Sequence, residues 1–167
     1  MYRIACLVSL FLAIVLVKPY AQRMDNKKME KIFKKEGIQV EGEKGAWMAY
    51  FNDAVLLVIT DEANNRMRIF TPIVEEEDAS PAQMSHMLKA NFHSALDAKY
   101  SIYEGFVVSV FTHPLGELTE GQLLDAMRQV AKLAETYGTT YSSTELIFGR
   151  EEEGEAEEKE KPVEKRS

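Results

Sequence analysis

The chain has 167 residues, 46% of them hydrophobic and 10% aromatic, which suffices for one compact domain and is too short for two of ordinary size. It carries 27 acidic and 20 basic residues, for a formal net charge of −7. This acidic balance argues against binding of nucleic acid and of membrane surfaces, because both kinds of binding draw on basic side chains.

The first segment predicts export. Arg3 precedes an unbroken run of apolar and small residues over 4–17, which is shorter than the roughly 20 residues of a spanning helix. The run fits a secretory signal peptide over residues 1–21, with cleavage after Ala21 and no stable membrane insertion afterwards. Pro19 suits the cleavage pattern poorly, so an uncleaved N-terminal anchor stays open as the alternative.

The cysteine content agrees with export. Cys6 is the one cysteine and lies inside the leader, so the mature domain carries no thiol. Loss of Arg3 and Lys18 with the leader takes the formal charge from −7 to −9. An exported protein of this size without disulfides is typical of a Gram-negative periplasm, and we expect a periplasmic or secreted protein.

A short helix opens the mature domain. Asp25 is its expected N-cap, Met29, Ile32 and Phe33 form a narrow apolar stripe, and Gly37 is the expected C′ residue. The lysines between 27 and 35 indicate a solvated face of this helix, with an acidic partner as the alternative.

Three strands are predicted next, over 47–51, 55–60 and 67–74, from their β-branched and aromatic residues. Asn52 and Asp53 both tolerate positive φ and suit a tight hairpin turn. Pro72 has no N–H for a ladder and indicates an edge or a bulge near the end of the third strand.

The centre of the chain reads helix, strand, turn, strand. Ser80 begins the helix, and two strands over 99–103 and 106–113 follow as a hairpin around Glu104-Gly105. One face of that helix is expected to consist of residues at helical spacing: Met84, Met87, Leu88, Asn91, Phe92, Ala95 and Leu96.

A last helix begins with a capping box at Thr119 and ends at Gly138. The single domain therefore spans 24–149. The glutamate-rich residues 150–167 are expected to be disordered. The sequence does not indicate where the short apolar segment 146–148 between them packs.

These elements predict an α+β fold in which three helices pack on a five-stranded antiparallel sheet, in the order α-β-β-β-α-β-β-α.

The pattern resembles the type III secretion chaperone-like fold, and within it the YbjN-type family of putative sensory-transduction regulators. The resemblance covers roughly 24–137 and is carried by Leu88, Asn91, Phe92, Tyr100-Ser101-Ile102, His113-Pro114-Leu115 and Leu118-Thr119. It implies a non-enzymatic domain that dimerises and holds partly unfolded partner segments along its sheet and helix surfaces. The export signal departs from secretion chaperones, which work in the cytoplasm.

The sequence gives little support to catalysis. It has no nucleophile elbow, no phosphate-binding glycine loop and no HExxH spacing, and we expect no enzymatic activity, no cofactor and no metal. His86, His93 and His113 are the residues that a metal site would need, while Asp97 and Glu104 are ordinary helix-end and turn residues. A small-molecule binder or hydrolase with a dispersed polar site is the competing function, and a structural envelope component is a third.

The remaining candidates are apolar. In the strand 106–113, Phe106, Val108 and Val110 point to one face, and Val107 and Phe111 point to the other. Helices covering both faces explain this pattern, and so does an exposed surface that binds a protein or peptide or a second copy of the chain. The candidate binding or dimer surface consists of Met84, Met87, Phe92, Tyr103, Phe106, Val107 and Phe111.

Overall fold

The computed structural model describes residues 23–146. The predicted signal peptide, the predicted acidic tail and most of the apolar segment 146–148 lie outside these residues. Within them the helices and strands follow in the order α2 (Asn26–Lys35), β1 (Gln39–Glu43), β2 (Ala46–Phe51), β3 (Ala54–Asp61), β4 (Arg66–Glu75), the 3-10 turn η1 (Glu76–Asp78), α3 (Pro81–His93), β5 (Lys99–Tyr103), β6 (Phe106–His113) and α4 (Glu120–Glu135).

The strands form one antiparallel sheet in the order β1-β2-β3-β4-β6-β5. The predicted number of five strands is therefore wrong, because β1 is a sixth. This strand is polar except for Val40, and Gly42 has a φ of 110° opposite Trp47, so the sequence lacks the alternation that indicates a strand. A Cβ at Gly42 would come 2.4 Å from the Ala46 carbonyl oxygen, which explains the glycine.

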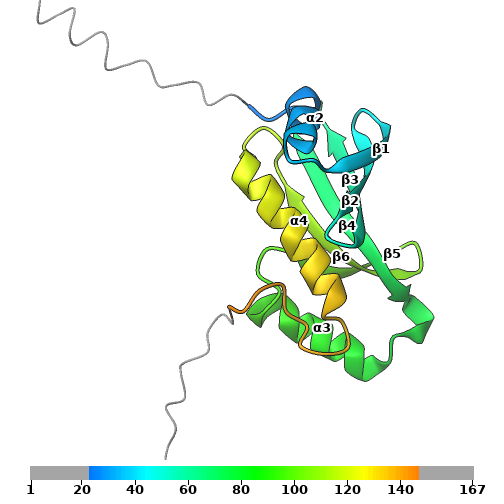
Figure 1. Cartoon of the computed structure of the whole chain (residues 1–167). Coiled ribbons are helices and arrows are strands. Elements are labelled where there is room, and N and C mark those ends of the chain that lie inside the picture. Colours follow the sequence, from blue (N-terminus) through cyan, green and yellow to red (C-terminus); the bar gives the residue numbers. More distant parts are fainter. Residues whose placement is uncertain (1–22, 147–167) are drawn as a thin grey trace, which may run out of the picture.

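The α+β class and the three helices are confirmed, and the helices bury their apolar side chains against one face of the sheet. Helix α4 crosses β3, β4 and β6 on this face, α2 lies near β1, and α3 lies near β5 (Figure 1). The core holds fully buried side chains of α2, α4 and the sheet, among them Met29, Leu56, Ile69, Leu123 and Met127. We call this helix-covered side the inner face.

Local signals set the helix starts as predicted. Asp25 caps α2, and Ser80 with Gln83 and Thr119 with Gln122 form capping boxes.

The expected side-chain stripe of α3 is only partly correct. The helix ends at His93, before Ala95 and Leu96. It buries Met87 and Ala90, while Leu88 and Phe92 point away from the core at 73% and 74% exposure. Within residues 23–146, no helix is long and apolar enough to cross a membrane.

Candidate protein-binding surface

The face of the sheet opposite the helices carries many apolar side chains, with Arg68 and Thr112 among them. Register pairs Met48 with Leu57, and Leu57 with Phe70, so these side chains share that face. The same pairing continues from Phe70 to Val110 on β6. We call this surface the outer face, and its apolar members are Met48, Tyr50, Val55, Leu57, Ile59, Phe70, Tyr103, Phe106, Val108 and Val110.

Large apolar side chains on the outer face stay open to solvent. Tyr50, Val55, Ile59, Tyr103 and Phe106 are between 41% and 49% exposed. No helix among residues 23–146 packs buried apolar side chains on this face, since the buried apolar side chains of the helices all belong to the inner core. Exposed large apolar side chains on four strands of one sheet face are unusual for a monomer and are typical of an interaction surface.

The outer face also has its own small packed cluster. Phe70 and Val108 are only 9% and 3% exposed, yet neither belongs to the inner core. The ring of Phe70 meets that of Tyr103 edge to face, with centroids 5.5 Å apart. This contact fixes part of the surface before any partner arrives, which lowers the conformational entropy lost on binding.

A second exposed apolar feature lies on α3. Leu88 and Phe92 are one turn apart, and Ile102 on the neighbouring strand β5 is 47% exposed. We call Leu88 and Phe92 the α3 ridge. Two side chains at this spacing project from the same side of a helix, as anchors of helix-mediated interfaces do.

The structure divides the candidate surface residues into three groups. Met87, Val107 and Phe111 are buried in the inner core, and Met84 packs against it. The remaining three are exposed on two different surfaces: Phe92 on the α3 ridge, and Tyr103 and Phe106 on the outer face.

Sequence reasoning missed the part of the outer face on β2 and β3. Met48, Tyr50, Val55 and Ile59 are all at least 36% exposed there. The signal was present, because residues 55–59 are apolar without interruption and such a strand carries apolar side chains on both of its faces.

The edge of the sheet at β5 is held by a side chain of α3. The Asn91 amide accepts a hydrogen bond from the Tyr100 N–H at 2.7 Å and donates one to the Tyr100 carbonyl at 3.1 Å. The Lys99 ammonium donates to the backbone carbonyls of Asn91 and Leu96, and burial lowers the pKa of Lys99. At Tyr100, Asn91 thus occupies the place that a neighbouring strand would take.

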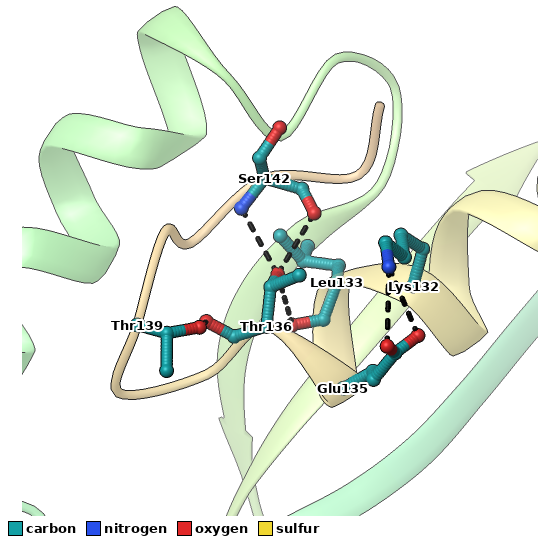
Figure 2. A network of polar contacts seen from close by, with 6 residues as sticks. All are labelled: Lys132, Leu133, Glu135, Thr136, Thr139 and Ser142. Carbon is teal, nitrogen blue, oxygen red and sulfur yellow. Dashed lines mark hydrogen bonds and ion pairs between the residues drawn. The ribbon is translucent and has the colours of Figure 1, made fainter. Parts of the chain in front are cut away.

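The segment after α4 is clasped to the same region. The Thr136 hydroxyl donates to the Ser142 carbonyl at 2.8 Å and accepts from the Ser142 N–H at 3.0 Å (Figure 2). The Ser94 hydroxyl donates to the Tyr141 carbonyl at 2.7 Å, and the Ser143 N–H donates to the Ser94 carbonyl at 3.1 Å. These bonds fix the chain beyond α4 beside the C-terminal end of α3.

A groove of about 1560 Å³ runs between α4, the β2–β3 turn, β4 and this clasped segment. Four of its charged side chains form two exposed ion pairs, Arg128 with Asp125 at 3.5 Å and Lys132 with Glu135 at 3.1 Å, and Figure 2 shows the second pair. Asp53 and Glu145 also line the groove. The four paired charges cancel, so they give the groove no net charge of their own.

The residues considered for chemistry do not converge. His86 lies against a tyrosine ring, His93 ends α3 and His113 ends β6. Asp97 and Glu104 stand at opposite ends of β5. No three histidine, cysteine, aspartate or glutamate residues within 23–146 are grouped so as to hold a metal.

Comparison with known proteins shows the fold. No family model and no curated protein matches the chain. A chain of the HopA1–SchA chaperone–effector complex matches with a TM-score of 0.53 at 12% identity, over 67% of this chain and 92% of that one. The Yersinia pestis type III secretion chaperone SycH, solved with a fragment of YscM2, matches with a TM-score of 0.54 at 12% identity, over 67% and 98%. Residues 23–146 thus have a fold like that of type III secretion chaperones.

Proposed function

We propose that this protein is a non-enzymatic, chaperone-like module that binds a segment of another protein on the outer face of its sheet. The observation that carries the proposal is the apolar outer face, which no described helix covers. An extended or amphipathic segment laid across β2, β3 and β4 would bury Met48, Val55 and Ile59. Each fully buried side chain of this size contributes about 1.5–3 kcal/mol.

We further propose a homodimer through the α3 ridge, an exported periplasmic or secreted location and membership of the YbjN-type family. Leu88 and Phe92 support the dimer, because two copies of a helix ridge pack against each other about a two-fold axis. The apolar run over 4–17 supports export. The chaperone-like fold supports the family.

The test pairs two double variants. Val55→Ser with Ile59→Ser removes apolar area from the outer face, and Leu88→Ser with Phe92→Ser removes it from the α3 ridge. Binding is measured on an array of 12-residue apolar peptides, the oligomeric state by light scattering, and folding by thermal melts.

The outer-face variant is expected to lose peptide affinity tenfold or more and to keep its oligomeric state, since each substitution removes roughly 1 kcal/mol or more of apolar burial. The ridge variant is expected to keep its peptide affinity and to become a monomer. Full peptide affinity in a folded outer-face variant would refute the proposed binding surface.

A further inference from the structure

The N-terminal helix α2 is strongly divided into an apolar and a basic side. Met29, Ile32 and Phe33 are buried in the inner core, whereas Lys27, Lys31 and Lys34 are exposed on the side that faces solvent. Asp25 caps the helix by accepting from the Lys28 N–H at 2.7 Å, which fixes where the helix and its lysine face begin.

The basic charge of the chain is concentrated on this helix. Six of the 20 basic residues of the chain lie between 23 and 35. Lys27, Lys31 and Lys34 recur at i, i+4 and i+7 and are exposed, and they take part in no ion pair within residues 23–146. Lys35 differs, because it pairs with Glu36 and Glu120.

The net charge of −7 therefore does not describe the α2 surface. The three lysines form a stripe of one sign, which Glu30 beside it only partly offsets, on a body that is otherwise acidic. An acidic body and a basic stripe orient the molecule at a negatively charged surface, with α2 toward it.

We propose that this stripe, Lys27, Lys31 and Lys34, binds the anionic headgroups of a lipid bilayer. Continuity of the chain favours this occupant: the apolar run ends at residue 17, ten residues before Lys27. Ten residues span at most about 35 Å, so whenever the run is in a bilayer, α2 stays near the membrane surface. Lysines held next to a membrane-bound segment are attracted to anionic headgroups by about 1 kcal/mol each.

The glutamate-rich residues 150–167 fit the stripe less well. The described chain leaves from the C-terminal end of α4, whereas α2 meets the N-terminal end of α4 through Lys35 and Glu120 (Figure 1). The two ends of this 16-residue helix are about 24 Å apart, so the tail would have to run back along the domain to reach α2, a distance that its length allows. In addition, lysines and arginines interrupt the glutamates of the tail.

The test uses the full chain and flotation with two kinds of vesicle, pure phosphatidylcholine and a mixture with about 30% phosphatidylglycerol. The ratio of the two affinities isolates the electrostatic part, because the apolar run enters both bilayers. The triple variant Lys27→Gln, Lys31→Gln, Lys34→Gln is expected to lower affinity for the anionic vesicles tenfold to about a hundredfold, with little change for the neutral ones. High salt is expected to remove the preference of the unchanged chain.

The matched control is the triple variant Lys89→Gln, Arg128→Gln, Lys132→Gln, which removes the same charge far from α2 and is expected to change the ratio less than threefold. Equal losses in the two triple variants, or no preference for anionic vesicles in the unchanged chain, would overturn the proposal. Deletion of residues 150–167 is expected to leave the ratio unchanged. A tenfold rise would show that the tail occupies the stripe instead.

Discussion

The two hydrogen bonds between Asn91 and Tyr100 at the β5 edge lead to the most specific stability prediction. Replacing Asn91 by leucine keeps a side chain of similar size but removes both hydrogen bonds to Tyr100, which are 2.7 and 3.1 Å long. Tyr100 is only 6% exposed, so water replaces these partners poorly. Two lost bonds of about 1 kcal/mol each, with the desolvation cost of the unpaired groups, predict a loss of about 2–4 kcal/mol in the free energy of unfolding.

The loss is measured by urea unfolding and by amide hydrogen exchange. It corresponds to a drop of roughly 10 °C in Tm for a domain of this size. The Tyr100 amide is expected to exchange faster, since its acceptor has gone. Asn91→Asp keeps the acceptor and removes the donor, so its free energy of unfolding is expected to fall by less. Lys89→Leu on the exposed side of α3 controls for the change to leucine alone. A loss below about 0.5 kcal/mol in Asn91→Leu, with unchanged exchange at Tyr100, would refute the reasoning.

Three further changes test other parts of the fold. Thr136→Val removes both bonds to Ser142 and is expected to cost about 1–2 kcal/mol in urea unfolding, with faster amide exchange at Ser142 as the specific sign. Gly42→Ala is expected to cost about 2–3 kcal/mol because it places a Cβ against backbone at a φ of 110°, whereas Gly121→Ala in α4 meets open space and is expected to be neutral or stabilising. Burial raises the pKa of Tyr100 in the folded state, so its contribution to stability is complete below about pH 10 and is lost as the pH rises above it. In Tyr100→Phe, urea unfolding between pH 9 and 11 is expected to show a flatter decline; an unchanged decline would contradict this assignment.

Local signals in the sequence predicted most of the elements, because they act over a few residues. The caps at Ser80 and Thr119 and the bulge just after Pro72 are where the residue types require them. Strand β1 was not predicted, because Val40 is its one apolar side chain and a single residue does not make an alternating pattern.

The surfaces were harder to predict, because burial depends on which elements meet. On α3, Met87 and Leu88 are neighbours of similar hydrophobicity, yet one is 4% and the other 73% exposed. Only the position of the helix at the end of the sheet decides between them. The hydrogen bonds that hold the segment after α4 could not be predicted either, since the bond from Ser94 to the Tyr141 carbonyl joins residues 47 apart.

The Asn91 amide at the β5 edge also affects how such molecules can polymerise. A fibril that grows strand by strand needs every subunit to offer two open edges, one for each neighbour. Here one side of the sheet ends against an asparagine amide, and β1 is the other side. Growth at β5 must therefore first displace the Asn91 amide from Tyr100, which makes this edge a less favourable site for strand addition than β1.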